Sequence, residues 1–306
     1  SPLKQHNINK PKDKNNLILV SHIDHYNQLN DGLGSVIVNN EVVSELNDKL
    51  ENINLCSLNS IEIVGSVYFL NKYKLNSSNT IAAISTNGLT LNTNLRFQLS
   101  GKKGSNINKL FTLFNKIYKS NSSIEEFRDG WGNDEIAFEV PGINIPCTSI
   151  HREPHLYYHT NLDDFTFFSD ASFNESKDLI KNIILCLDKN YTVKIKNWNG
   201  LICLAHPEVD LYIEPMSISN ISQNSNLEKF KYFKDVSAIE IEYLISNQQI
   251  VRNFCNKFQS FLSNNENVTI IDIAFEFSLP VSFVIGYFEE LKKRGFLSLD
   301  YRSQIE

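Results

Sequence analysis

The chain has 306 residues, which exceeds the usual size of one domain and predicts one large α/β unit with a smaller second unit. Hydrophobic residues make up 42% of the chain and charged residues 21%, a composition typical of globular proteins that excludes a mainly disordered chain. The formal net charge of −6 at pH 7 provides no general attraction to nucleic acid or to anionic lipid, so we expect neither as a partner.

The apolar runs, the cysteines and the first residue give expectations about cellular location, the state of the thiols and missing N-terminal sequence. Runs such as 17–20 are far too short to span a bilayer, and no charged-then-apolar leader opens the chain, so we expect a cytoplasmic protein. The five cysteines are scattered and never form a C-x-x-C pair, which predicts reduced, mostly buried thiols. Because the chain begins at Ser1 without methionine and soon reaches candidate site residues, we expect that N-terminal sequence has been removed.

Strands and helices are predicted to alternate through the first 190 residues. A polar lead-in at 1–16 precedes the apolar run at 17–20, which predicts a strand buried on both faces. The further expected elements are a helix at 36–50, a strand at 53–58, an aromatic-rich helix, a strand at 81–85, a helix at 109–118, a strand at 146–150 and a helix at 175–188. This alternation predicts an α/β fold with a mostly parallel sheet covered by helices on both faces.

The pattern changes in the last third of the chain. Between 191 and 236 the regular alternation gives way to short extended segments and polar loops. We expect this segment to connect a first domain at 1–190 to a second domain at 237–306. The second domain is predicted to contain a long helix at 238–262, helices at 270–277 and 281–293, and a strand at 296–299, the order of a winged helix. Because it carries nine acidic against six basic residues, we expect it to serve packing or dimerisation rather than DNA binding.

Candidate functional residues gather where the predicted strands end. The carboxyl ends of parallel strands meet at one edge of a sheet, so the polar residues directly after the apolar runs are the first candidates. His22, Asp24 and His25 follow the first strand, Asp31 opens the next helix, and Glu62 lies in the turn after the second strand. Asp31 has the alternative role of capping that helix.

A second group of candidates lies much later in the chain. Asp134 and Glu135 stand in a polar turn, and the residues from His151 to His159 follow the strand at 146–150. Five of the seven histidines fall in this last cluster and in the cluster after the first strand. Imidazole and carboxylate groups suit zinc, and a catalytic zinc ion needs about three protein ligands with an open position for water. The spacing by itself leaves open whether these residues bind a metal or are ordinary solvated side chains.

Five short stretches follow one another in an informative order: His22-Ile-Asp-His25, Asn30-Asp31-Gly32-Leu33-Gly34, Glu62-Ile-Val-Gly65-Ser66, Gly132-Asn-Asp134-Glu135 and Tyr158-His159-Thr160-Asn-Leu-Asp163-Asp164. Their order resembles that of the leucyl-aminopeptidase-type zinc exopeptidases. The resemblance is greatest to the bacterial aminopeptidase-like branch, which carries a C-terminal winged helix. It covers roughly residues 17–190 and depends on the ordered set rather than on any one stretch.

The resemblance implies a role for each matched residue. His22, Asp134 and His159 would bind zinc, and Asp31 would be a ligand able to bridge two metal ions. Glu62 would be the general base.

Further residues would support the ligands or contact substrate: Asp24, His25, Glu135, Arg152 and Tyr158. Asp24 would orient His22 as a hydrogen-bonded carboxylate. Arg152 and Tyr158 would contact substrate or an oxyanion, with packing as the alternative role.

The sequence departs from the family pattern at two places. Family members have two adjacent glutamates after the second strand, whereas Glu62 stands between Ile61 and Ile63. The usual acidic residue after the third strand is replaced by Thr86-Asn87. We therefore expect one zinc ion rather than two.

These observations predict a zinc-dependent hydrolase of an amide bond, of aminopeptidase type, that acts on a small peptide or a peptide-like metabolite. A homo-oligomer is compatible with the sequence. Two other functions remain open: a catalytically degenerate relative that binds a ligand without turnover, and a winged-helix regulator with a sensor domain. The zinc content of the purified protein separates these alternatives.

Overall fold

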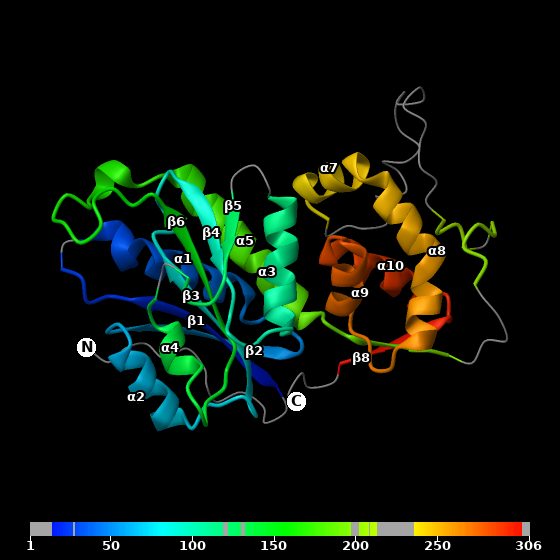
Figure 1. Cartoon of the computed structure of the whole chain (residues 1–306), viewed down its shortest axis with the longest axis horizontal. Coiled ribbons are helices and arrows are strands. Elements are labelled where there is room, and N and C mark those ends of the chain that lie inside the picture. Colours follow the sequence, from blue (N-terminus) through cyan, green and yellow to red (C-terminus); the bar gives the residue numbers. More distant parts are fainter. Residues whose placement is uncertain are drawn as a thin grey trace. The chain divides into compact units, whose positions relative to one another are not determined.

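The structure, a computed structural model, describes residues 14–26, 28–118, 122–129, 132–196, 202–207, 209–212 and 236–301. The chain divides into two compact units, one formed mainly by residues up to Asp188 and the other mainly by Lys189–Arg302 (Figure 1). Most of the predicted lead-in at 1–16 and most of the predicted connection at 191–236 lie outside the described residues.

The N-terminal unit is built on a six-stranded sheet with the strand order β2-β1-β3-β6-β4-β5. The first four strands in this order run parallel, β4 pairs antiparallel with β6, and β5 runs parallel to β4. The strands are β1 (Asn15–His22), β2 (Ile53–Ser60), β3 (Thr80–Asn87), β4 (Asn94–Gln98), β5 (Ser122–Glu125) and β6 (Cys147–Glu153). The prediction of a mostly parallel α/β sheet is confirmed.

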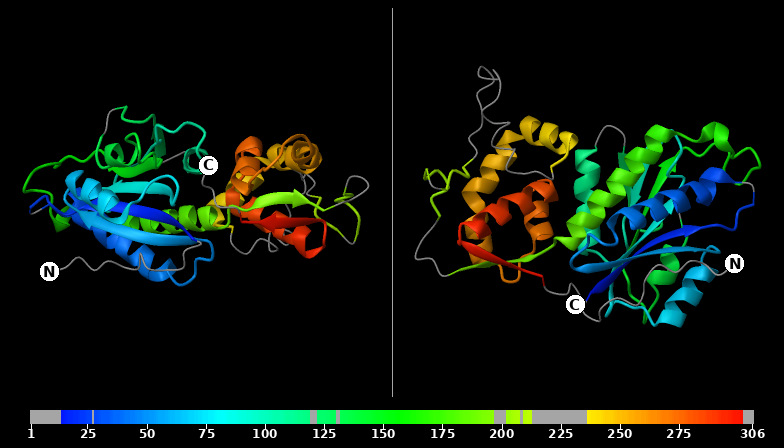
Figure 2. Two further views of the ribbon diagram at one scale, coloured as in Figure 1. Left: turned by 90° about the horizontal axis from the view of Figure 1, so that it is seen from below. Right: turned by 180° about the vertical axis from the view of Figure 1, so that it is seen from behind.

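Helices cover both faces of this sheet. On one face α1 packs against α5, and both lie in front of the sheet in the right-hand view of Figure 2. On the other face α2 packs against α4. Helix α3 contacts β4 through Phe111 and Phe97, whose ring centroids are 5.4 Å apart. The helices are α1 (Gly34–Leu46), α2 (Val64–Tyr73), α3 (Asn106–Ile117), α4 (Glu135–Phe138) and α5 (Asp170–Asp188).

The apolar run of β1 reflects burial on both faces of the sheet. Ile18 and Val20 belong to the core cluster that includes Phe69 of α2. Side chains alternate along a strand, so Leu17 and Leu19 point to the opposite face, and they too are fully buried. A strand in this position has no polar face, which is why the sequence shows four consecutive apolar residues at 17–20.

The sequence pattern does not predict strands β4 and β5 of this sheet. They have five and four residues, and β5 is only partly buried along its whole length. Arg96 of β4 donates to Glu125 of β5 over 2.8 Å. Short, partly exposed strands that carry paired charges show neither an apolar run nor a clear alternation, so periodicity cannot identify them.

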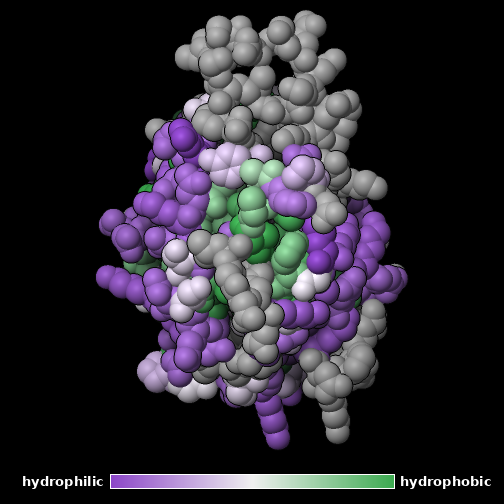
Figure 3. Space-filling view, turned by 90° about the vertical axis from the view of Figure 1, so that its right-hand side faces the viewer, coloured by the Kyte–Doolittle hydropathy of each residue, from purple (hydrophilic) through white to green (hydrophobic). Residues whose placement is uncertain are grey.

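The C-terminal unit combines four described helices with a two-stranded antiparallel sheet of β7 and β8. Phe254, Phe258 and Tyr287 form a fully buried aromatic core. Figure 3 shows hydrophobic residues in the middle of the face of this unit, bordered by hydrophilic ones. Its elements are β7 (Thr192–Ile195), α7 (Ala238–Ser246), α8 (Gln248–Asn264), α9 (Ile270–Phe277), α10 (Val281–Lys293) and β8 (Leu297–Asp300).

The expected long helix at 238–262 is in fact two helices. Asn247 has φ −123° and ψ 40°, which ends α7, and its side-chain amide donates to the carbonyl of Tyr243. A polar side chain that satisfies a carbonyl of the last turn favours a helix end, although the apolar periodicity continues across it. The sequence α9, turn, α10, β8 matches the expected order of elements, and the winged-helix assignment stays a prediction. No helix within the described part of the chain has the length and apolar character needed to cross a membrane.

The thiols lead to a first prediction. All five cysteines lie in the described residues and none forms a disulfide; Cys203 is exposed and the other four are buried. Burial raises the pKa of Cys56 to about 11 and, with nearby carboxylates, raises that of Cys147 well above its ordinary value. Because the thiolate is the reactive form, we expect iodoacetamide to label Cys203 in the folded protein and all five cysteines only after unfolding. Peptide mass mapping measures this; labelling of Cys56 or Cys147 as fast as Cys203 in the folded protein would contradict the burial described.

Candidate metal centre

The site lies at the edge of the sheet where three parallel strands end. Strand β1 ends at His22, β2 at Ser60 and β3 at Asn87. After β1 the chain forms an irregular turn at Leu29–Leu33 that leads into α1. After β2 it turns at Glu62 and enters α2. The polar residues at and after these strand ends therefore lie at one edge of the sheet, where the sequence pattern predicts them.

The centre of the site is the fully buried carboxylate of Asp31. Its Oδ1 lies 3.0 Å from Nε2 of His22 and accepts a hydrogen bond of 2.9 Å from the side-chain amide of Asn87. Its Oδ2 lies 2.8 Å from Nδ1 of His25 and 3.3 Å from Nε2 of His159. Segments from three parts of the chain thus place three imidazoles and one amide around one carboxylate.

The surroundings shift the pKa values of this pair in opposite directions. For Asp31, burial favours the neutral acid, but the hydrogen bonds from His22 and Asn87 outweigh it and lower the pKa of the carboxyl. For His22, burial favours the neutral ring, but the hydrogen bond and the charge of Asp31 outweigh it and raise the pKa. Asp31 is therefore an anion at neutral pH and can act as a ligand.

Gly32 is required by the close approach of the turn to β1. Its φ is +133°, a conformation that L side chains rarely adopt. A Cβ atom here would lie 2.2 Å from the carbonyl oxygen of His22 and 2.7 Å from the His22 ring. Glycine therefore lets the backbone after Asp31 pack directly on His22, which brings the two side chains together.

Asp163 holds the backbone that carries Asp31. Its buried carboxylate accepts hydrogen bonds from the backbone N–H groups of Asn30 and Asp31, over 3.0 and 2.8 Å, and from the Asn30 side chain over 2.7 Å. The pKa of Asp163 is lowered because these bonds and His155, 3.5 Å away, outweigh the effect of burial. Although Asp163 belongs to one of the matched stretches, its supporting role was not predicted.

Glu62 and Asp24 lie beside the histidines at the more open side of the site. Oε2 of Glu62 is 3.8 Å from Nε2 of His25, and the Glu62 side chain is 28% exposed. Asp24 accepts a 3.3 Å hydrogen bond from the backbone N–H of Glu62. Nδ1 of His22 instead faces the side chain of Asn133, 3.4 Å away. Asn133 thus has the orienting position that we expected for Asp24.

Asp134 stabilises the turn that presents Glu62. Its Oδ1 accepts hydrogen bonds from the backbone of Ile63, over 2.9 Å, and from the hydroxyl of Ser66, over 2.6 Å. Burial raises the pKa of Asp134. The neighbouring Glu135 is fully buried and accepts from the backbone of Asn133. The contacts of Asp134 give its Oδ1 a structural role, whereas its Oδ2 is buried without a hydrogen-bond partner among the described residues. Zinc binding by Asp134 stays a prediction.

Arg152 and Tyr158 differ in their relation to the site. The guanidinium of Arg152 donates to the carbonyl of Thr93 over 2.7 Å and to Ser176 of α5 over 3.2 Å, and its side chain is 3% exposed. These contacts favour the packing role for Arg152. The ring of Tyr158 stacks on His159 with centroids 3.8 Å apart, and burial together with the charges of Asp31 and Glu62 raises its pKa to about 12.

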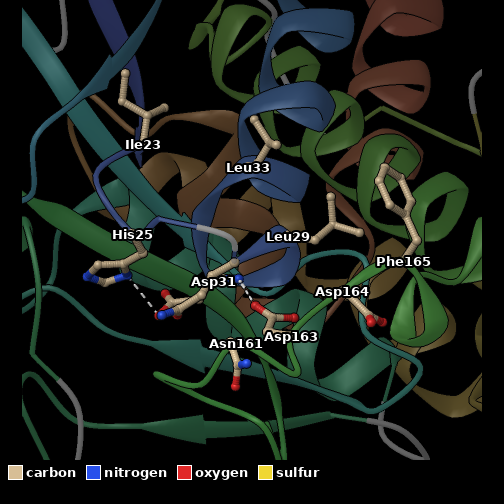
Figure 4. Close-up of a pocket in the computed structure, with 10 residues that line it drawn as sticks. Ile23, His25, Leu29, Asp31, Leu33, Asn161, Asp163, Asp164 and Phe165 are labelled. Atoms are coloured by element: carbon tan, nitrogen blue, oxygen red, sulfur yellow. Dashed lines mark hydrogen bonds and ion pairs between the residues drawn. The ribbon is translucent and has the colours of Figure 1, made fainter.

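A cavity of about 470 Å³ opens beside Asp31 (Figure 4). It lies between the loop that follows β1 and the loop after His159, and its wall combines apolar with acidic side chains. The lining residues are Ile23, His25, Gln28, Leu29, Asp31, Leu33, Asn161, Asp163, Asp164 and Phe165. A volume of this size suits a small molecule or the end of a peptide.

The donor atoms present here fit a zinc ion. Ligand atoms of His22, His25 and Asp31 all lie within 4.8 Å of one another, and imidazole nitrogen with carboxylate oxygen is a common zinc donor set. Oδ1 of Asn133 is buried and has no hydrogen-bond partner among the described residues. Rotation of this amide by 180° would let Oδ1 accept from Nδ1–H of His22, which leaves the Nε2 lone pair directed at Asp31 and a metal.

Replacement of Asp163 by Asn provides a second prediction. The amide nitrogen would face the donors of Asn30 and Asp31, so at least one buried donor loses its acceptor and the protein should lose about 1–3 kcal/mol of unfolding free energy. Urea denaturation measures this loss. The matched control is Asp164→Asn, because Asp164 is exposed and, among the described residues, accepts from Thr166 alone, a bond that Asn can keep. Equal stability of the two variants would show that the Asp163 network does not hold the turn.

The fold resembles those of several solved protein structures. Over 94% of this chain, the fold is similar to the crystal structure of a "putative peptidase" from Clostridium acetobutylicum, with a TM-score of 0.69 and 17% identity. The chain spans 58% of the length of that protein. A zinc aminopeptidase from Bacillus subtilis matches 57% of this chain and 46% of its own, with a TM-score of 0.46 and 13% identity. A glutaminyl cyclase from Porphyromonas gingivalis matches 57% of this chain and 74% of its own, with a TM-score of 0.47 and 12% identity.

The first of these likenesses shows a shared fold, and the other two are too low to carry an argument. No curated protein matches the sequence. Membership of the leucyl-aminopeptidase type therefore stays a prediction. A family profile described as "Domain of unknown function (DUF4910)" matches residues 5–190, which is more than half of the sequence. The chain therefore belongs to the DUF4910 family.

Proposed function

We propose that the chain is a zinc-dependent hydrolase of an amide bond that removes the N-terminal residue of a small peptide or a peptide-like metabolite. The observation that carries this proposal is the arrangement around Asp31, where His22 and His159 lie 3.0 and 3.3 Å from a buried carboxylate beside an open cavity. The fold shared with a protein named a "putative peptidase" supports the same reaction class.

His22, Asp31 and His159 are the residues that would hold the zinc ion. When bound, zinc lowers the pKa of a coordinated water toward about 7 and polarises the substrate carbonyl. Asn87 and Gly32 keep the Asp31 carboxylate and the His22 ring in place through the contacts described above. Asn87 is an amide where the resembled family has an acid, so the site carries less negative charge, which favours one metal ion over two.

Glu62 is the group that would move the proton. It takes a proton from the attacking water and returns it to the nitrogen of the leaving amine. Its carboxylate is 28% exposed and 3.8 Å from His25, so it is open to substrate and close to the ligands. The hydrogen bonds that Asp134 accepts from Ile63 and Ser66 fix the turn that carries Glu62.

The cavity suits a substrate with an apolar side chain and a positively charged amine. Ile23, Leu33 and Phe165 line it and are exposed, so they offer apolar surface that a substrate can cover. Asp164 in the same wall is also exposed and can attract an ammonium group. A free N-terminal residue with an apolar side chain combines both features.

A degenerate ligand-binding protein is the second candidate function. The observation that favours it is the pair of departures at Ile63 and Asn87, which removes two carboxylates from the resembled metal site. Hydrolysis of a panel of dipeptides with free and acetylated N-termini distinguishes the two functions. Absence of turnover of every free N-terminus, with or without bound zinc, would favour the ligand-binding protein.

Substitution of Glu62 by Gln is the third prediction. The amide keeps the size of the side chain but loses its basicity, so kcat should fall by roughly 10²-fold or more. Zinc content and melting temperature should hardly change, because Gln still offers an oxygen toward His25. Steady-state kinetics, metal analysis and thermal unfolding on one preparation measure all three. Loss of zinc along with activity would instead make Glu62 a ligand, and full activity would remove it from the mechanism.

The fourth prediction concerns the metal itself. The wild-type protein should contain about one zinc ion per chain, and His159→Ala should lower that content sharply, because a site of three or four ligands rarely survives loss of an imidazole. His206→Ala is the control, since His206 is an exposed histidine of the C-terminal unit. Mass spectrometry under native conditions measures the stoichiometry. Equal zinc in His159→Ala and the control would rule out His159 as a ligand.

A further inference from the structure

The candidate metal centre lacks two carboxylates that the resembled family has. Ile63 stands in place of the second glutamate, and Asn87 in place of an acidic residue. In the structure Ile63 donates its backbone N–H to Asp134, and Asn87 donates its side-chain amide to Asp31. Neither residue offers a carboxylate oxygen to a metal, which leaves room in the ligand set for a donor from another position.

We propose that His25 is this donor and binds the zinc ion through Nδ1, an inference that rests on the proposed zinc-dependent function. Nδ1 of His25 is 2.8 Å from Oδ2 of Asp31, closer than either Nε2 of His22 or Nε2 of His159 is to that carboxylate. The ligand atoms of His22, His25 and Asp31 all lie within 4.8 Å of one another.

The spacing that zinc requires is within reach of these atoms. Ligand atoms at the corners of a tetrahedron with bonds of about 2.0–2.1 Å are about 3.3–3.4 Å apart. Side-chain shifts on the order of 1 Å therefore bring the three ligand atoms to this spacing, without movement of the strands. Nε2 of His159, 3.3 Å from Oδ2 of Asp31, adds a fourth donor, and water would enter as a fifth ligand, a coordination number that zinc also accepts.

The position of the His25 ring supports the same role. The ring lies between the other two imidazoles, with centroids 4.8 Å from that of His22 and 4.7 Å from that of His159. Its second nitrogen, Nε2, faces Oε2 of Glu62 at 3.8 Å. A metal-bound histidine almost always gives its other N–H to a carboxylate, a carbonyl or water, and Glu62 is placed to accept it.

The alternative role of His25 is to hydrogen-bond Asp31 without binding zinc. The variant His25→Asn distinguishes this role from that of a zinc ligand. An asparagine amide can place a donor where Nδ1 lies and can keep the hydrogen bond to Asp31, but it cannot replace an imidazole ligand for zinc. If His25 only supports Asp31, His25→Asn should behave like wild type and His25→Ala should not. If His25 is a ligand, both variants should fail in the same way.

The experiment measures zinc affinity by competition with a chromogenic chelator and the visible spectrum of the cobalt-substituted protein. Wild type, His25→Asn, His25→Ala and the control His206→Ala are compared, and thermal unfolding of the metal-free forms shows that each variant folds. We expect the two His25 variants to bind zinc more than about 100-fold more weakly than wild type, beyond the roughly 10–100-fold loss typical of a residue that only supports a ligand. Their cobalt spectra should change because the donor set changes.

A zinc affinity of His25→Asn within tenfold of wild type, with an unchanged cobalt spectrum, would overturn the inference. This result would leave the proposed function intact as long as wild type holds zinc and hydrolyses peptides. Wild type that binds zinc without hydrolysis would refute the proposed reaction, and the affinities and spectra would still decide the role of His25. Wild type without affinity for zinc would overturn both.

Discussion

The burial of one charged carboxylate organises the functional edge of the N-terminal unit. Asp31 is fully shielded from solvent and its pKa is lowered, so the protein holds an anion in a place where an isolated charge would be very unfavourable. Such a charge persists only when it is paired and hydrogen-bonded, and the imidazoles of His22, His25 and His159 with the amide of Asn87 satisfy this condition. A zinc ion bound by Asp31 and these imidazoles would compensate the charge of the carboxylate more completely.

The fold supplies the rigidity that this arrangement needs. Strand β1 is buried on both faces and ends directly at His22, which leaves this ring little freedom. Gly32 brings the following turn against that ring, and Asp163 accepts two backbone N–H groups of the same turn. Close packing at Gly32 and the buried hydrogen bonds of Asp163 therefore fix the position of Asp31.

Local backbone strain marks the turn that presents Glu62. Ile63 has a φ of +56°, which is unusual for a β-branched residue, and strain of this kind costs on the order of 1–3 kcal/mol and persists only where surrounding contacts enforce it. The hydrogen bonds that Asp134 accepts from Ile63 and Ser66 are such contacts. Asp134 thus contributes to the site by holding a conformation through Oδ1.

The sequence by itself determined the α/β class and the edge of the sheet where the site lies, because a strand buried on both faces leaves a continuous apolar run and parallel strands end together. It also identified His22, Asp31 and His159 as close candidates. The tertiary structure alone decided the contacts of His25, Asp134 and Asp163. His25 meets Asp31 within one irregular loop, and Asp134 and Asp163 meet partners far away in the chain; neither kind of contact leaves a periodic signal in the sequence.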